Sequence, residues 1–233
     1  MDTRTRKKLA SKICSFIFKS NARVLAFGST DEAFELMKAV IAKFTSKQLK
    51  QLSIIPTTYE IAEYAFNKGI RIADINRNID LAVEFASKAD KNFNFIKLKT
   101  TSLVRDKIIA FNTKELVVCC NQENMQDYVH GRILFEVVPF GWEHSLAELS
   151  RFGDAWLLEN SNGIIKTENG NYLIAVDVEP IYSPEDIEYQ SKKVPGVIET
   201  SLFIGLADRI LLYNSKVKEI KHKAETVLTK IEL

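Results

Sequence analysis

The stretch Val24-Leu-Ala-Phe-Gly-Ser-Thr30 sets the class of fold, because a short buried strand passes here through a glycine into a helix. Residues 31–44 continue with helical spacing, and one face of that helix collects Phe34, Met37, Val40 and Ile41. A strand that leads directly into an amphipathic helix is the repeating unit of a parallel sheet covered by helices. The stretch therefore predicts an α/β fold.

The same alternation continues through the first half of the chain. Buried strands are expected at residues 52–55, 70–75, 81–85 and 116–120. Helices are expected after Thr58, which can cap a helix that Gly69 ends, and at residues 103–111. This order predicts a mostly parallel sheet with helices on both faces, a three-layer Rossmann-like arrangement.

The pattern changes after Gly131. Strands are expected at residues 133–138, 156–159, 172–178 and 197–204, and helices at residues 143–152 and after the Ser183-Pro184 start signal. Their order, β-α-β-β-α-β, is that of a ferredoxin-like α+β unit. We therefore expect residues 131–206 to form a small lid domain inserted into a large domain of residues 1–130 and 207–233, with a cleft between them. A strand at residues 210–213 returns to the large sheet, and residues 217–231 have the pattern of a basic amphipathic helix.

Composition excludes some classes of function. The chain has 233 residues, 46% of them hydrophobic, and a net charge of +2, which indicates no particular partner. No apolar stretch reaches the roughly 18 residues that span a bilayer, so no membrane partner is expected. Three cysteines in apolar runs suggest buried free thiols in a reducing cytoplasm. The three histidines are scattered, so no metal site is predicted.

Candidate binding groups begin at Ser29 and Thr30, which follow a strand and open a helix. Backbone N–H groups at a helix N-terminus bind phosphate, and both hydroxyls could add to them. The simpler alternative is that one of these residues caps the helix. Asp31 and Glu32 come next and would repel a phosphate. A basic first helix, with Lys7 among its cations, could touch an anionic ligand, a membrane or a nucleic acid, or be a solvated face.

Longer runs add a family resemblance along nearly the whole chain. Ser102-Leu-Val-Arg-Asp-Lys-Ile-Ile-Ala110, Thr167-Glu-Asn-Gly-Asn171 and Val194-Pro-Gly-Val-Ile-Glu199 resemble, in order and spacing, motifs of the ribose-5-phosphate isomerase A family. Gly28-Ser-Thr30 is similar to the end of that family's G-x-G-T-G-S-T loop. Pro56-Thr-Thr-Tyr59 resembles the start of its T-S-F-Q-T stretch.

The resemblance locates a reaction centre that is altered here. In the family motif D-G-A-D-E, Glu84 stands at the first aspartate and Ser87 at the second. In K-G-G-G-G-A-L-x-R-E-K, Lys97 matches, residues 98–101 replace the glycines, and Asp106 stands at the glutamate. The lysine of a later D-x-S-K motif is absent from the run Asn121-Gln-Glu-Asn124.

The resemblance implies aldose–ketose isomerisation of ribose 5-phosphate to ribulose 5-phosphate, without metal or organic cofactor. Asp106 would be the base, with Glu84 as acid partner and Lys97 as cation, and the substrate would contact Lys7, Ser29, Thr30, Thr57 and Thr58. Asp106 is one methylene shorter than glutamate, and a misplacement of about 1 Å can cost on the order of 10²-fold in rate, so weakened turnover is expected. Asp80 and Asp90 are candidates to compensate for the altered aspartate pair.

Other interpretations stay open. Taken without the resemblance, Asp106 is a surface carboxylate on a helix. The chain as a whole could be a catalytically inactive family member that binds a sugar phosphate or a protein partner. A scaffold that binds nucleic acid through two terminal helices is a third interpretation, although no basic patch with interleaved aromatics supports it. The resemblance also implies a cytoplasmic homodimer or homotetramer.

Overall fold

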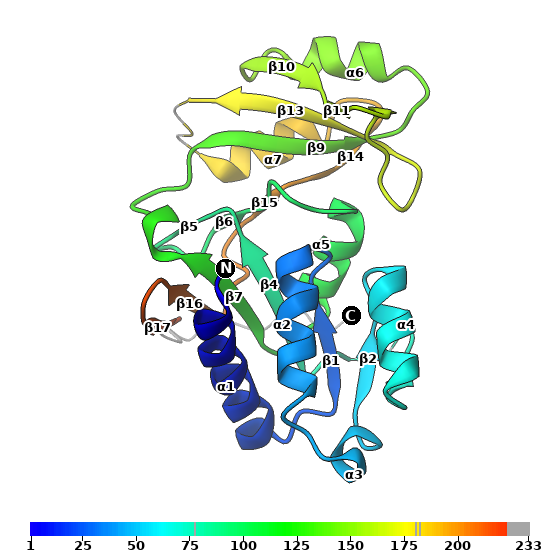
Figure 1. Ribbon diagram of the computed structural model, residues 1–233. Coiled ribbons are helices and arrows are strands. Elements are labelled where there is room, and N and C mark those ends of the chain that lie inside the picture. Colours follow the sequence, from blue (N-terminus) through cyan, green and yellow to red (C-terminus); the bar gives the residue numbers. More distant parts are fainter. Residues whose placement is uncertain (77, 180, 182, 223–233) are drawn as a thin grey trace.

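The computed structural model describes residues 1–76, 78–179, 181 and 183–222 (Figure 1). Within them, the largest sheet has the strand order β17-β16-β7-β4-β1-β2-β3. Neighbouring strands from β16 to β3 pair in parallel, and β17 pairs with β16 in antiparallel fashion. The strands are β1 (Val24–Phe27), β2 (Ser53–Ile55), β3 (Arg71–Ile72), β4 (Leu81–Ala86), β7 (Leu116–Asn121), β16 (Arg209–Tyr213) and β17 (Val217–Lys221). The prediction of a mostly parallel sheet is confirmed.

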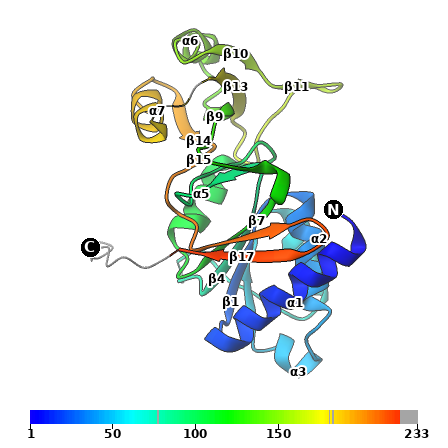
Figure 2. The ribbon, with the colours of Figure 1, turned by 90° about the vertical axis from the view of Figure 1, so that its left-hand side faces the viewer.

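The pleat of this sheet separates two hydrophobic cores. Leu25, Phe27 and Val83 pack with α1, α2 and α4, whereas Ala26 and Ala82 face α5. Figure 2 shows α1 and α2 on one side of the sheet and α5 on the other, so the three layers are confirmed. The helices are α1 (Thr3–Ser20), α2 (Asp31–Ile41), the short α3 (Ser46–Leu49), α4 (Tyr59–Asn67) and α5 (Leu103–Phe111).

A second, antiparallel sheet lies above the first in Figure 1 and has the order β10-β13-β9-β14. Along the chain its elements run β9 (Gly131–Val137), α6 (Trp142–Leu149), β10 (Asp154–Leu157), β13 (Tyr172–Val178), α7 (Pro184–Ser191) and β14 (Val197–Thr200). A small hairpin of β11 (Glu159–Asn160) and β12 (Gly163–Ile164) joins β10 to β13. This chain order with this strand order is the ferredoxin-like arrangement.

A small sheet of order β15-β6-β5-β8 lies between the two larger ones. Its strands are β5 (Lys88–Asp90), β6 (Phe95–Ile96), β8 (Met125–Gln126) and β15 (Leu202–Phe203), and a 3₁₀ turn, η1 (Gln122–Asn124), precedes β8. The single strand predicted for residues 197–204 is therefore wrong, because the chain changes sheets at Ser201. The Ser201 N–H donates to Leu134 O of β9, and Ser201 O accepts from the N–H of Lys97.

The helix predicted for residues 217–231 is also wrong over residues 217–221, and residues 223–231 lie outside the described part of the chain. Residues 217–221 form β17, which covers the free edge of β16. Glu219 on β17 pairs with Arg209 and with Lys12. The unpaired backbone groups of an edge strand favour a neighbouring strand here over the helical spacing of the sequence.

Several helices and strands are shorter than predicted, whereas the predicted helix caps are confirmed. The helix predicted over residues 31–44 ends at Ile41, and the strand expected at residues 70–75 is only Arg71–Ile72. The side chains of Thr58 and Ser183 cap α4 and α7 as predicted. The three cysteines are buried and free, as expected. No helix within the described residues is long and apolar enough to cross a bilayer.

Candidate active site

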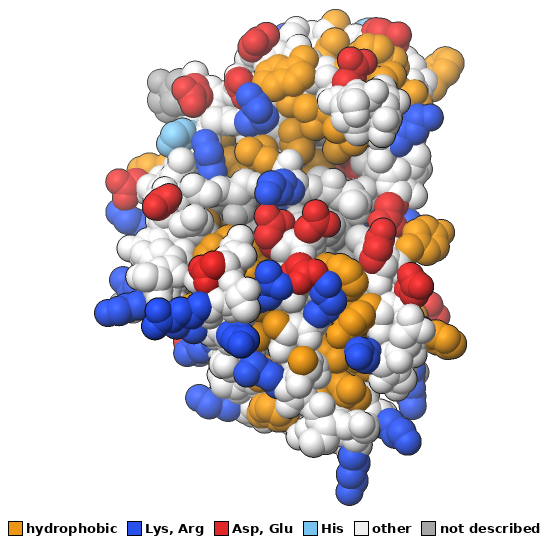
Figure 3. All heavy atoms as spheres, viewed as in Figure 1, with side chains coloured by type: hydrophobic (Ala, Val, Ile, Leu, Met, Phe, Trp, Pro, Cys, Tyr) orange, Lys and Arg blue, Asp and Glu red, His pale blue; other side chains and the backbone are white. Residues whose placement is uncertain are grey.

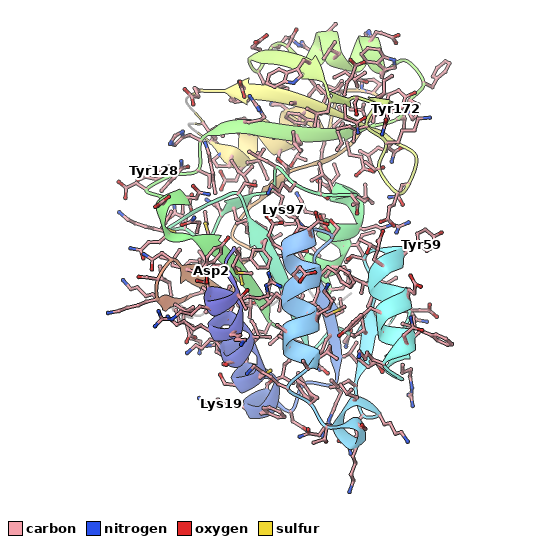
Figure 4. The ribbon with its side chains drawn as sticks, viewed as in Figure 1. Asp2, Lys19, Tyr59, Lys97, Tyr128 and Tyr172 are labelled. Atoms are coloured by element: carbon pink, nitrogen blue, oxygen red, sulfur yellow. The ribbon has the colours of Figure 1, made fainter. Side chains whose placement is uncertain are left out.

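Three charged side chains meet where the large sheet approaches the small one. Lys97 Nζ lies 2.5 Å from Glu84 Oε2 and 2.6 Å from Asp106 Oδ2, and all three residues are fully buried. Glu84 comes from the middle of β4, Lys97 follows β6, and Asp106 lies in the first turn of α5. Figure 4 labels Lys97 at the junction between the lower and upper parts of the molecule. We call Glu84, Lys97 and Asp106 the buried triad.

The triad is stabilised by its own charges, because an isolated buried ion would be very unfavourable. Burial raises the pKa of Glu84 to about 7; the Lys97 ammonium opposes this shift and the Asp106 carboxylate adds to it. For Lys97, burial alone would lower the pKa, but the carboxylates of Asp106 and Glu84 outweigh it and raise the pKa. Lys97 therefore stays charged near neutral pH, where Glu84 can be either protonated or ionised.

Two hydroxyl groups also donate to the same oxygen of Asp106. Asp106 Oδ2 lies 3.0 Å from Ser29 Oγ and 2.7 Å from Thr100 Oγ1. The other carboxylate oxygens, Asp106 Oδ1 and Glu84 Oε1, are buried without a hydrogen-bond partner among the described residues. Each of the two carboxylates thus has one oxygen held by donors and one oxygen open to accept a proton.

The loop of residues 98–101 covers the triad. The N–H of Thr101 donates to Ser29 Oγ at 3.2 Å, and the N–H of Ser102 donates to Thr100 Oγ1 at 2.9 Å. Lys99 points outwards and pairs with Glu32 of α2 at 2.9 Å. In Figure 3 acidic and basic side chains lie side by side over the start of α2. Thr100, at one of the positions of the family's glycines, therefore accepts from the N–H of Ser102 and contacts Asp106.

The predicted substrate-binding hydroxyls other than Ser29 are used within the fold. Thr30 caps α2 by accepting from the N–H of Ala33, and Thr58 caps α4 in the same way. Thr57 Oγ1 donates to Phe27 O at 2.8 Å. Capping, the simpler alternative for the helix start, is thus confirmed for Thr30. Lys7 is exposed on α1, and no described contact joins it to the triad.

Asp80 and Asp90, the candidates to compensate for the altered aspartates, do not contact the triad. Asp80 accepts from the N–H groups of Arg23 and Val24 at the start of β1. Asp90 is buried and accepts from the N–H and the side-chain amide of Asn94. Both carboxylates hold backbone in place. The interpretation of Asp106 as a surface carboxylate is wrong as well, since Asp106 is fully buried.

Sequence reasoning missed Glu136, a fully buried carboxylate on β9. It accepts from the N–H of Val104 at 3.1 Å, Thr167 Oγ1 at 2.9 Å and Asn171 Nδ2 at 2.8 Å. Glu136 therefore joins the Thr167–Asn171 turn to the first turn of α5, which carries Asp106. The sequence does carry a signal for this residue, because Glu136 is an acidic residue inside the apolar run at 133–138.

Within the described residues, no group of three or more His, Cys, Asp or Glu side chains could hold a metal ion. What the triad offers is acid–base chemistry next to a fixed positive charge.

Comparison with known proteins agrees with this fold. The family model described as ribose 5-phosphate isomerase A (phosphoriboisomerase A) matches residues 53–216, more than half of the chain. Ribose-5-phosphate isomerase A of Pyrococcus horikoshii is 30% identical over 220 residues, which cover 91% of this chain and 95% of that protein. The human ribose-5-phosphate isomerase is 28% identical over 214 residues, covering 88% of this chain and 68% of that protein.

Solved structures show the same arrangement. A D-ribose-5-phosphate isomerase in complex with phospho-erythronic acid superposes with a TM-score of 0.84 at 28% identity, covering 95% of this chain and 100% of that one. The ribose 5-phosphate isomerase A of Methanocaldococcus jannaschii shares the fold, with a TM-score of 0.84 at 22% identity and the same coverage. The chain belongs to the ribose 5-phosphate isomerase A family.

Proposed function

We propose that this protein interconverts ribose 5-phosphate and ribulose 5-phosphate by moving a proton between C2 and C1 of the open-chain sugar. The observation that carries the proposal is the buried triad, in which Lys97 bridges Glu84 and Asp106 and leaves one oxygen of each carboxylate without a described partner. The relatives and the closely superposing structure bear the names of ribose-5-phosphate isomerases, which supports the same reaction.

Asp106 Oδ1 is the proposed base. It takes the proton from C2 of the aldose, while the protonated Glu84 donates its proton to the carbonyl oxygen on C1. The product of these two transfers is an enediol with one hydroxyl on each carbon. The pKa of about 7 at Glu84 suits the donor, because a group with a pKa near the working pH can both give and take a proton.

The second half of the reaction reverses the roles of the two carboxyl groups. Glu84, now ionised, takes the proton from the hydroxyl on C2, and Asp106 returns its proton to C1. A ketone forms at C2 and a primary alcohol at C1, and both side chains recover their starting states. Lys97 does not transfer a proton in this scheme; its ammonium stabilises the negative charge that develops on the sugar oxygens.

We assign the phosphate to Lys7, which is exposed on α1. Helices α1 and α2 begin at the same end of the sheet, and Arg6 pairs with Glu35 between them (Figure 1). The hydroxyls of Thr30, Thr57 and Thr58 contribute by holding the loops that surround this end. Ser29 acts on the base, to which it donates a hydrogen bond.

Turnover should be weaker than in relatives that keep the glycine loop. The N–H groups of Thr101 and Ser102 already donate to Ser29 Oγ and Thr100 Oγ1, so they are less available to a developing oxyanion. One such donor is commonly worth about 10²–10³ in rate.

A direct assay tests the proposal. Purified protein is incubated with ribose 5-phosphate, and ribulose 5-phosphate formation is followed, while phospho-erythronic acid is added in parallel as an inhibitor and as a stabiliser against heat. We expect measurable turnover that the sugar acid phosphate inhibits. Binding without turnover would instead favour the catalytically inactive alternative. The absence of both binding and turnover would show that sugar phosphates are not ligands of this protein.

The lid arrangement is part of the same proposal. Residues 131–206 would form the lid, and residues 1–130 with 207–233 the large domain, with the substrate between them. The separate sheet of β9, β10, β13 and β14 supports this division. Hydrogen exchange on the intact protein tests it, since two domains should exchange as two cooperative groups and a single group would contradict it.

A homodimer or homotetramer in the cytoplasm is the expected assembly and location. Light scattering on purified protein and fractionation of cells that express it test the two statements. A monomer at micromolar concentration, or recovery with membranes, would contradict them.

A further inference from the structure

The hydroxyl group of Thr100 has hydrogen-bond distances that favour one acceptor for its proton. Its Oγ1 accepts from the N–H of Ser102 at 2.9 Å and lies 2.7 Å from Asp106 Oδ2. An ionised carboxylate can accept hydrogen bonds but cannot donate one, and a backbone N–H can donate a hydrogen bond but cannot accept one. Ser29 Oγ, 3.2 Å from Thr100 Oγ1, is a second possible acceptor, but the shorter distance of 2.7 Å favours donation of the Thr100 proton to Asp106.

Ser29, whose Oγ lies 3.2 Å from Thr100 Oγ1, repeats this arrangement. Its Oγ accepts from the N–H of Thr101 at 3.2 Å and donates to Asp106 Oδ2 at 3.0 Å. The neighbouring N–H groups of Thr101 and Ser102 thus act on one carboxylate oxygen, each through a hydroxyl. With Lys97, three donors converge on Oδ2, while Oδ1 has no described partner.

The asymmetry matters because a carboxylate turns easily about its last torsion angle, which has broad, twofold minima. Such a turn would exchange Oδ1 and Oδ2. Lys97 alone restricts this rotation weakly, since an ammonium is a compact charge with rotatable donors. Lys97 Nζ also donates to Glu84 Oε2 at 2.5 Å, so it does not hold Asp106 alone. The directed O–H groups of Thr100 and Ser29 define which oxygen stays open.

We infer that Thr100 is a positioning residue that keeps Asp106 Oδ1 aimed at the substrate carbon. This inference rests on the proposed function, in which Oδ1 is the base. Thr100 does not touch the reacting atoms; it acts through Asp106. It stands in the covering loop, where no recognised motif calls for a threonine.

Thr100→Val tests the inference because it keeps the shape and removes the hydroxyl. We expect kcat to fall about tenfold or more, since a misplacement of about 1 Å can cost on the order of 10²-fold. KM should change less than twofold, because the substrate is bound by other groups. Thr100→Ser restores a hydroxyl and should recover most of kcat.

The neighbouring threonine supplies a matched control. Thr101 Oγ1 is buried without a described partner, so Thr101→Val removes a hydroxyl from the same loop without removing a bond to Asp106. Thr101→Val should keep kcat within twofold of wild type. Equal losses in the two valine variants, or a rise in KM alone for Thr100→Val, would overturn the inference.

Crystal structures of both valine variants separate this inference from the proposed function. If the wild type lacks isomerase activity, the proposed function fails, yet the orientation of Asp106 can still be observed. We expect the Asp106 carboxylate to turn or to adopt two conformers in Thr100→Val and to stay in place in Thr101→Val. An unchanged carboxylate in Thr100→Val would overturn the inference whatever the activity.

Discussion

A Cβ atom placed on Gly28 would lie 2.1 Å from Oε2 of Glu84, so the end of β1 and the carboxylate on β4 leave no room for a side chain between them. Gly28 donates its N–H to Val83 O in the same region, which keeps its backbone close to β4. Glycine is therefore required here by close approach and not by an unusual backbone angle. The contact also limits where the Glu84 carboxylate can move.

Gly28→Ala should displace that carboxylate. Overpacking of this kind costs about 1–3 kcal/mol, so we expect Tm to fall by several degrees and kcat to fall about tenfold. The control is Glu84→Asp in the Gly28→Ala background, because the shorter side chain relieves the clash. The double variant should be more stable than the two single effects predict, whereas strict additivity in thermal unfolding would contradict the contact.

Lys97→Met should destabilise the protein strongly by leaving two buried carboxylates without a cation. Removing one partner of a buried ion pair costs about 3–5 kcal/mol, and the loss should diminish at acid pH as the carboxylates take up protons. Lys99→Met is the matched control, since its exposed pair with Glu32 is worth about 0–1 kcal/mol. Urea unfolding at pH 5 and pH 8 measures the stability loss of both variants. Similar losses for Lys97→Met and Lys99→Met would contradict the prediction.

Stability should depend on pH through Glu84. The folded-state pKa is about 7 and the ordinary value is 4.5, so the folded protein binds the extra proton more tightly than the unfolded chain. The contribution of Glu84 is therefore fully present below about pH 4.5 and is lost as pH rises through 7. The unfolding free energy of wild type relative to Glu84→Gln should fall across this window. A flat difference between pH 4.5 and 8 would show that Glu84 is ionised throughout.

Much of the fold was predictable from local patterns. The helix Leu103–Phe111 was predicted at its true bounds, because Ser102 caps it and its apolar residues have helical spacing. The strand Val24–Phe27 was equally clear. Residues 217–221 were not, because their helical spacing is overruled by pairing with β16, a contact that no local pattern contains.

The site was predictable in part. The resemblance brought Glu84, Lys97 and Asp106 together, and the structure places them in direct contact. It gave no sign that Thr100 would hold Asp106, since a hydroxyl in a loop is ordinary until its partners are known. Glu136 was missed for a related reason: its donors come from turns that are distant in the sequence.

Asp106→Asn tests most directly whether Asp106 is the base, because the amide keeps the shape while losing the basic oxygen. Purified wild type and Asp106→Asn are assayed together for conversion of ribose 5-phosphate to ribulose 5-phosphate, with thermal unfolding to show that both are folded. We expect turnover by the wild type and a loss of about 10²–10⁴ in kcat for the variant, the usual contribution of a positioned base. Turnover by a folded Asp106→Asn variant at the wild-type rate would show that Asp106 is not the base.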